Sequence, residues 1–292
     1  MGTPLRGKFL VTGATGQLGE LVIDALLGRL SADRIVAATR SPLSIEAQRL
    51  RSKGVDVRVV DYREPELVAA AFEGMERLLL ISGTDAHARV QQHRNAITAA
   101  EQAGIELIVY TSVLRAPESA LAVAQDHRQT EADLVASRVP HAILRNGWYT
   151  ENYLASLRSA LDRGVLFGCA RDGRICSAAR ADYAEAAAIV LSTDDHVGRV
   201  YELAGDEAFT LDELASQAAS ISGQPIVYRD LSPSEYRDKL RAAGLRDELA
   251  DLLVDSDACA AKGALEDCSR QLSVLIGRPT RPLGEVLADG LR

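Results

Sequence analysis

The chain has 292 residues, of which 47% are hydrophobic, 25% are charged and 4% are aromatic, and its formal net charge is −8. This acidic balance provides no global positive field for nucleic acid or an anionic membrane surface, and no apolar stretch approaches the roughly 20 residues of a bilayer-spanning helix. The four cysteines form no C-x-x-C pair, and Gly13 interrupts the first apolar run too early for a signal peptide, so we expect a reduced, cytoplasmic protein without bound metal.

Strand-like and helix-like segments alternate through the first half of the chain. Short apolar runs predict six strands, at residues 7–13, 34–40, 55–61, 77–82, 105–112 and 141–146. Apolar residues at helical spacing predict helices between them, at residues 17–30, 45–54, 66–74, 89–104 and 122–137. This alternation predicts an α/β, Rossmann-like fold, a doubly wound parallel sheet covered by helices on both faces.

The pattern changes after Asn146. We expect a helix over 149–162, an irregular stretch over 164–179, a helix over 181–192, a strand over 199–205 and a mainly helical segment over 223–292. Thr210 stands three residues before Glu213, the pattern of a capping box at a helix start. We therefore expect an NADP-binding Rossmann-like domain over 1–150 and a smaller, mainly helical substrate lobe over 151–292, with about 175–205 returning to the first domain's core.

The segment FLVTGATGQLGELV places three glycines, Gly13, Gly16 and Gly19, between a buried strand and an amphipathic helix. In a dinucleotide-binding turn the first glycine permits a tight exit, the second lets the backbone approach a pyrophosphate and the third lets helix and strand pack closely. The helix N-terminus then offers unpaired N–H groups to the pyrophosphate. The alternative is a purely structural turn.

The end of the second strand indicates which dinucleotide is bound. Arg40 and Ser41 stand where NAD-preferring sites carry a carboxylate for the ribose 2′-hydroxyl. A guanidinium binds a 2′-phosphate with two parallel hydrogen bonds, so NADP is favoured over NAD, the alternative being a solvated arginine. Asp61 closes the third strand, where it either contacts the adenine edge or caps a helix. The small residues Ser82 to Thr84 close the fourth strand, where a cofactor can lie against the backbone.

The Tyr-x-x-x-Lys pair that many short-chain dehydrogenases use to protonate a carbonyl is absent, because no tyrosine is followed by lysine at the fourth position after it. Either the chain keeps the nucleotide as a signal, or its substrate accepts hydride without a strong general acid. A quinone is such a substrate, because aromatisation stabilises the hydroquinone anion, which can take its proton from water. The enzyme then has to hold the ring over the nicotinamide and supply one or two hydrogen-bond donors.

The sixth strand ends in LRNGWYTENY, which places Asn146, Trp148 and Tyr149 at the expected mouth of the site. Flat aromatic walls suit a flat ring, although Trp148 could equally anchor the C-terminal lobe. His127 lies on the helix before this strand, where we expect it to be exposed, with a proton relay as the alternative. Asn146, Tyr149 and His127 are the candidate catalytic proton donors.

These segments, together with RADYAEAAA, DSDACAAKGAL and LIGRPTRPL, resemble the type 2 NADPH-dependent quinone oxidoreductases of the NmrA-like, atypical short-chain dehydrogenase/reductase family. The resemblance extends almost end to end, and LRNGWYTENY and LIGRPT are specific to this subgroup. It implies a Rossmann-like NADP(H) domain, a small C-terminal lobe and reduction of a quinone-like small molecule by direct hydride transfer.

The resemblance also implies a set of cofactor-contacting residues. Besides Gly19 of the glycine turn, they are Gly13, Ala14, Thr15, Gly16, Gln17, Leu18, Arg40, Ser82, Gly83, Thr84, Leu144, Arg145, Asn146, Gly147, Trp148, Tyr149 and Ile175. The end of the fourth strand reads SGT here, a mild departure from the serine-rich end in the family that still leaves room for a cofactor.

Three alternatives stay open. The chain could be a triphenylmethane dye reductase, since these enzymes share VTGATGQLG and LRN, although they depart from GWYTENY. It could be a redox-sensing regulator without turnover, as NmrA itself is. It could also be an inactive paralogue that retains the fold alone. The physiological quinone, the oligomeric state and any additional sensing role do not follow from the sequence.

Overall fold

A computed structural model describes residues 7–292 of the chain. The first six residues, on which the signal-peptide prediction partly depends, lie outside the described part. The chain divides into two compact units. The first comprises residues 7–116, Gln125–Asn146 and Arg180–Tyr201, and the second comprises Pro117–Ala124, Gly147–Ala179 and Glu202–Arg292.

The first unit is built on a seven-stranded sheet with the order β3-β2-β1-β4-β5-β6-β8. Adjacent strands from β3 through β6 pair in parallel. The strands are β1 (Lys8–Val11), β2 (Ile35–Thr39), β3 (Asp56–Val59), β4 (Met75–Leu80), β5 (Leu107–Val113), β6 (His141–Asn146) and β8 (Val200–Leu203). The winding direction reverses between β1 and β4, where ligands of doubly wound folds bind beyond the carboxyl ends of the strands. The predicted Rossmann-like, doubly wound α/β fold is confirmed.

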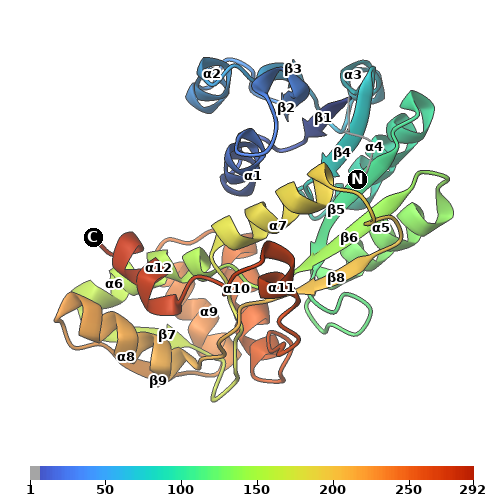
Figure 1. Cartoon of the computed structure of the whole chain (residues 1–292). Coiled ribbons are helices and arrows are strands. Elements are labelled where there is room, and N and C mark those ends of the chain that lie inside the picture. The colour runs from blue at the N-terminus through green and yellow to red at the C-terminus, as the bar shows by residue number, and fades with distance from the viewer. Residues whose placement is uncertain (1–6) are drawn as a thin grey trace. The chain divides into compact units, whose positions relative to one another are not determined.

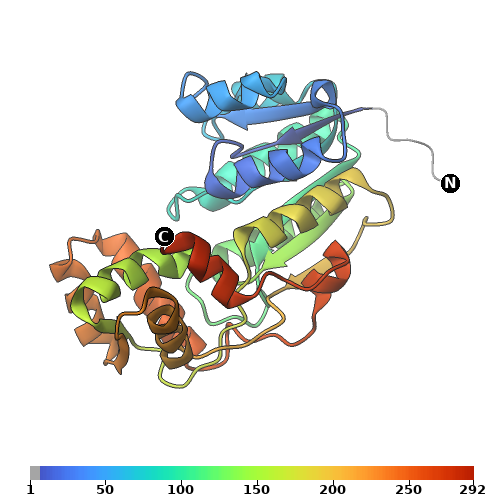
Figure 2. The same cartoon turned by 60° about the vertical axis from the view of Figure 1, so that its left-hand side comes forward.

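Helices cover both faces of this sheet (Figure 1). On one face lie α1 (Gln17–Leu27), α2 (Ile45–Ser52) and α7 (Arg180–Ser192), and on the other lie α3 (Pro65–Phe72), α4 (Arg89–Ala103) and α5 (Ala124–Ala136). Although α1 and α7 are far apart in the sequence, they pack side by side, blue and yellow in both views (Figures 1 and 2).

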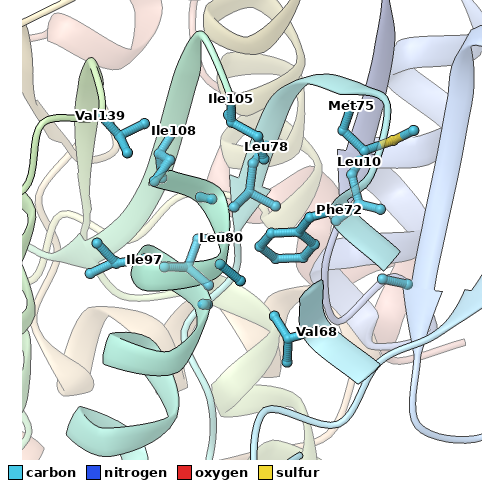
Figure 3. Close-up of a cluster of buried hydrophobic side chains, with 14 of the residues drawn as sticks. Leu10, Val68, Phe72, Met75, Leu78, Leu80, Ile97, Ile105, Ile108 and Val139 are labelled. Atoms are coloured by element: carbon cyan, nitrogen blue, oxygen red, sulfur yellow. The ribbon is translucent and has the colours of Figure 1, made fainter. Parts of the chain in front are cut away.

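One hydrophobic core of the first unit lies between the sheet and the helices α3 and α4. Figure 3 shows the side chains of Leu10, Leu78 and Leu80 on the strands facing Phe72 and Ile97 on the helices. Because a parallel sheet is covered on both faces, its central strands are apolar almost throughout, which is why short apolar runs identified them in the sequence.

The second unit is mainly helical. After a 3₁₀ turn (Thr150–Tyr153) it contains α6 (Leu154–Arg163), α8 (Leu211–Ser222), α9 (Pro233–Ala242), α10 (Asp247–Ala260), α11 (Gln271–Ile276) and α12 (Leu283–Gly290). The expected capping box is present, with both reciprocal bonds between Thr210 and Glu213.

The second unit also contains a small sheet that the sequence did not indicate. The strands β7 (Val165–Gly168) and β9 (Val227–Asp230) pair in parallel. The expectation of an irregular stretch over 164–179 was therefore wrong at its beginning, and the segment over 223–292 is mainly helical except for β9. Both strands are very short, and each finds its partner in a distant part of the sequence, so neither has a local signal.

Candidate functional site

The turn after β1 has the geometry that its glycines predicted. Gly13 adopts φ +59°, a left-handed conformation that favours glycine. A Cβ atom on Gly19 would lie 2.2 Å from the Gly13 carbonyl oxygen and 2.7 Å from the Ala14 Cα, so α1 approaches the turn too closely for any side chain there. Gly16 is the N-cap residue of α1 and brings no side chain to the first-turn N–H groups, which are therefore available to an anion.

A groove of about 380 Å³ lies in the first unit at the carboxyl ends of β1 to β4. It contains most of the residues that we expected to contact the cofactor: Gly13, Thr15, Gly16, Gln17, Leu18, Gly19, Arg40, Ser82, Gly83 and Thr84. Ala14 lies fully buried beneath the turn, where its N–H donates to the Ala38 carbonyl at 3.1 Å.

Two hydroxyls join the glycine turn to the end of β2. The Oγ1 atoms of Thr15 and Thr39 lie 2.8 Å apart, and Thr39 Oγ1 also accepts the N–H of Ser41 at 3.1 Å. These bonds hold the segment that carries Arg40 beside the turn.

Arg40 is exposed in the groove, and its guanidinium makes no hydrogen bond or ion pair with any residue from 7 to 292. Of the two carboxylates that line the groove, Asp61 is bound by Arg63, with Nη2 and Oδ2 2.6 Å apart, and the exposed Asp85 accepts the N–H of His87 at 3.1 Å. The hydrogen bonds from Arg63 lower the pKa of Asp61 to about 2. At the end of β2 the groove therefore offers an available guanidinium, while the charge of the neighbouring Asp61 is balanced by Arg63, a combination that suits a phosphate.

The loop after β4 is held by α4. The N–H of Gly83 donates to Nε2 of His93 at 3.0 Å, and Nε of Arg89 donates to the Gly83 carbonyl at 2.7 Å. Because Nε2 is the acceptor, the ring proton is on Nδ1, which donates to Oγ1 of Thr130 at 2.9 Å. Burial, with a further contribution from the Arg89 charge, lowers the pKa of His93 to about 3, so the ring stays neutral.

His127 is buried, and the expectation that it is exposed was wrong. It is 5% exposed, and its Nδ1 lies 2.7 Å from the Tyr110 hydroxyl on β5. Burial is the largest cause that lowers its pKa to about 3. The helical pattern of α5 did not reveal which of its polar residues faces the sheet.

The remaining predicted residues lie outside this groove. On β6, Leu144 is fully buried, Arg145 is bound to Glu131 with Nη2 and Oε2 2.6 Å apart, and Asn146 is 5% exposed. Gly147, Trp148, Tyr149 and Ile175 belong to the second unit. There Tyr149 pairs with Ala178, and the fully buried Ile175 pairs with Phe209.

The second unit contains an apolar cavity of about 350 Å³. Its walls come from the segment around α6, from β7 and from the helices α9 and α10: Trp148, Asn152, Tyr153, Ala155, Ser156, Ser159, Arg163, Val165, Leu166, Phe167, Tyr236, Lys239, Leu240, Ala243, Leu245, Leu249, Leu252, Leu253 and Asp257. We call this space the apolar cavity. Its volume lies within the range of about 300–1,000 Å³ of small-molecule sites.

Asp257 of α10 is the buried carboxyl group of the apolar cavity, and no motif of the sequence marks it as a functional residue. It is 7% exposed, and burial raises its pKa to about 7. A local signal exists in SDACAAKG, where an acid stands among small residues on a helical pattern. That signal does not distinguish a cavity acid from a solvated one.

Within residues 7–292 no group of three or more His, Cys, Asp or Glu side chains is arranged to hold a metal ion. No helix in the same range is long and apolar enough to cross a membrane.

Residues 13–194 match the NAD(P)H-binding family. The chain is 49% identical over 275 residues to quinone oxidoreductase 2 of Escherichia coli (strain K12), covering 94% of this chain and 96% of the relative. The crystal structure of the NADPH-dependent quinone oxidoreductase QOR2 from E. coli in complex with NADPH superimposes with a TM-score of 0.94 at 48% identity, over 97% of this chain and 100% of that one. The Citrobacter sp. triphenylmethane reductase complexed with NADP(H) superimposes with a TM-score of 0.92 at 34% identity, over 98% and 100% of the two chains.

Proposed function

The chain belongs to the NAD(P)H-binding family, and we propose that it reduces quinones with NADPH as the hydride donor. The observation that carries the reaction class is the 49% identity to quinone oxidoreductase 2 over 94% of the chain. The choice of NADPH is supported by the relative's NADPH complex and by the Arg40 side chain of the groove.

The groove of the first unit fits the adenosine and pyrophosphate part of this cofactor. The first-turn N–H groups of α1 and the backbone at Gly16 favour the pyrophosphate. Arg40, which the described chain leaves without an ion-pair partner, binds the 2′-phosphate through two charge-assisted hydrogen bonds. A carboxylate at this position would instead repel that phosphate.

The residues between Leu144 and Tyr149, together with Ile175, serve the nicotinamide half of the cofactor. Among the candidate donors, His127 is hydrogen-bonded to Tyr110 inside the first unit, so Asn146 and Tyr149 are the better candidates for direct contact with substrate.

When bound, NADPH supplies a hydride, which carries two electrons to the quinone; one proton then completes the hydroquinone. The chain has to bind the ring, orient it and stabilise the developing oxyanion. The absent Tyr-x-x-x-Lys pair is compatible with this reaction because the hydroquinone anion is stabilised by aromatisation and can be protonated by water.

Triphenylmethane dyes are a second candidate substrate class, because the Citrobacter triphenylmethane reductase is 34% identical over nearly the whole chain. A redox sensor of the NmrA type would bind the dinucleotide without turning over a substrate, and this distinguishes it from both enzymes. The second unit, with its apolar cavity, is the part of the chain that we assign to the substrate.

The test is the oxidation of NADPH by the purified chain with and without 1,4-benzoquinone, followed by the absorbance of the reduced nicotinamide. NADH is run in parallel, the direct reaction of NADPH with quinone is subtracted, and crystal violet replaces the quinone in a second series. Turnover that is much faster with NADPH than with NADH is expected. Tight NADPH binding without turnover of quinones or dyes would contradict the enzymatic proposal and leave the sensor.

A further inference from the structure

Three buried polar residues lie together on the wall of the apolar cavity, and we call this cluster the polar end; the other polar residues of the lining are Asn152, Ser156, Ser159, Arg163 and Lys239. Asp257, Tyr153 and Tyr236 form the polar end, and each is at most 8% exposed. In the part of the chain that the structure describes, neither tyrosine hydroxyl has a hydrogen-bond partner, and Asp257 uses one carboxylate oxygen, Oδ2, which accepts the N–H of Cys169 at 2.9 Å. Polar groups that face a cavity in this way are hydrogen-bonded to a ligand or to water in folded proteins, so this end can bind either.

The backbone is shaped to admit the Asp257 carboxyl group. Gly168 ends β7 beside it, and a Cβ atom at position 168 would lie 2.8 Å from Oδ2 of Asp257 and 2.7 Å from Leu211 Cδ1. Any side chain there would displace the carboxyl group from its bond to Cys169. The glycine and the N–H donor together hold Oδ2, and they leave Oδ1 as the oxygen available for a ligand.

The surroundings of Asp257 favour its protonated form. Burial raises its pKa to about 7, and the charge of Asp230 contributes in the same direction. The other titratable groups near it on the packed elements are Cys169 after β7, Tyr153 before α6, Tyr228 on β9 and Tyr236 on α9, whose pKa values are raised chiefly by burial. Arg163 and Lys239 also line the cavity, and neither contributes to the raised pKa of Asp257. The cysteine and the three tyrosines stay neutral near pH 7, so Asp257 is the member of the cluster that changes charge there.

We propose that the apolar cavity binds the quinone ring and that Asp257, as the neutral acid, donates a hydrogen bond to a quinone oxygen together with Tyr236. This inference rests on the proposed function and names the substrate-binding residues of the second unit. A quinone matches because it is flat, uncharged and apolar except for its carbonyl oxygens, which accept hydrogen bonds. The carboxylic acid and phenol at the polar end supply donors, and the leucine, Trp148 and Phe167 side chains cover the ring.

Two residues at the rim connect the cavity with solvent. Leu249 and Leu252 line it and are 43% and 39% exposed, so each side chain faces both the cavity and water. An apolar ring can therefore enter between them without removing a charged side chain from water.

The single tryptophan of the chain is a built-in reporter, because Trp148 lines this cavity. We would titrate the cofactor-free protein with 2-methyl-1,4-naphthoquinone and follow the quenching of tryptophan fluorescence, with a correction for absorption by the quinone. Without NADPH no reduction takes place, so the signal reports binding. Saturable quenching is expected, and it should weaken as the pH rises from 6 to 8 because an ionised Asp257 no longer donates.

Three variants test the polar end. Asp257→Asn keeps an N–H donor and an acceptor for Cys169, so binding should persist and lose its dependence on pH. Tyr236→Phe keeps the ring and removes the hydroxyl, so binding should weaken about 3- to 10-fold, the effect of one neutral hydrogen bond. Asp251→Asn changes a surface acid of the same helix that pairs with Arg237, and it should leave affinity and pH profile as in the wild type.

Two other ligands decide what the polar end recognises. Naphthalene, which has the ring without the oxygens, should bind more weakly and without a pH dependence. Crystal violet is a cation, so an ionised Asp257 should attract it, and its affinity should rise with pH where that of the quinone falls. Equal binding of naphthalene, or a quinone affinity that changes neither with pH nor in Tyr236→Phe, would overturn the proposal and leave water at the polar end.

This outcome is distinguishable from a failure of the proposed function. If the chain oxidises NADPH with quinones but Trp148 quenching is insensitive to the variants, the enzyme stands and the cavity proposal falls. If the quinone binds as described but neither quinones nor dyes are turned over, the cavity proposal stands and the enzymatic function falls.

Discussion

The backbone N–H of Gly83 donates a hydrogen bond to Nε2 of His93 at 3.0 Å, and this bond joins a loop of the groove in the first unit to a buried helix side chain. Arg89 of the same helix binds the carbonyl of Gly83 at 2.7 Å, so both polar groups of this residue are held from α4. The orientation of the loop therefore depends on a neutral imidazole that lies behind it.

We expect His93→Leu to raise the KM for NADPH roughly tenfold while kcat changes less, because a buried donor without an acceptor costs about 1–3 kcal/mol. His93→Gln retains an acceptor oxygen and should recover most of the affinity. The measurement is steady-state kinetics at varied NADPH, with thermal unfolding as a control for folding. An equal fall of kcat in both variants with unchanged KM would argue against a positioning role.

The buried histidines predict a loss of stability in acid. The pKa of His93 and that of His127 are about 3, below the ordinary value of 6.5, so the unfolded chain binds protons that the folded chain does not. Their contribution is fully present above pH 6.5 and is lost as the pH falls toward 3. Urea unfolding between pH 7 and 4 should show this slope, and His127→Gln should reduce it. His87→Gln, at an exposed position, is the matched control and should leave the slope unchanged.

Arg40 should determine the preference for NADPH over NADH. Arg40→Ala removes two charge-assisted hydrogen bonds to the 2′-phosphate, so kcat/KM for NADPH should fall about 10- to 100-fold while that for NADH stays within about twofold. Arg29→Ala, an exposed arginine outside the groove, controls for the loss of net positive charge. A parallel loss with both nucleotides would show that Arg40 does not read the 2′-phosphate.

Gly19 should tolerate no side chain. The Cβ atom of Gly19→Ala would lie 2.2 Å from a backbone oxygen, and relief of that contact requires movement of the turn itself. We expect a loss of about 1–3 kcal/mol in the free energy of unfolding and a loss of NADPH binding. Gly28→Ala is the matched control, because φ there is −73° and the nearest atom would be 3.5 Å away. The measurements are thermal unfolding and NADPH titration of both variants, and equal behaviour of Gly19→Ala and Gly28→Ala would contradict the prediction.

Asp257 should make stability depend on pH in the opposite direction to the histidines. Its pKa of about 7 lies above the ordinary value of 3.8, so the folded chain holds a proton that the unfolded chain releases. Stability from this group is therefore present below pH 3.8 and falls as the pH rises toward 7. Asp257→Asn removes this dependence, so the free energy of unfolding of the variant, relative to that of the wild type, should rise between pH 3.8 and 7. A constant difference between pH 4 and 8 would contradict the raised pKa.

Several features could be predicted from the sequence because they depend on residues close together along the chain. The strand, glycine turn and helix of residues 9–22 form one continuous segment, so the conformational roles of Gly13 and Gly19 followed from the glycine spacing together with the strand before it and the helix after it. The parallel order of the sheet followed from the alternation of strands and helices, and the helix start at Thr210 followed from its capping pattern.

Other features depended on contacts between distant segments. His127 was expected to be exposed because its helix is polar, but α5 turns that residue toward Tyr110 of β5. The strand β7 was expected to be irregular because its hydrogen-bond partner, β9, lies much further along the chain, beyond α7 and α8.

The sequence by itself thus determined the class of fold, through the order of its strands and helices, and the geometry of the glycine turn, which is encoded within a few neighbouring residues. It also singled out Arg40, to which we assign the preference for NADPH. Only the tertiary structure decided that Asp257 is buried at the end of an apolar cavity. That environment is assembled from segments that lie far apart in the sequence, from Trp148 to Asp257, and burial of a carboxyl group depends on all the segments that remove water from it.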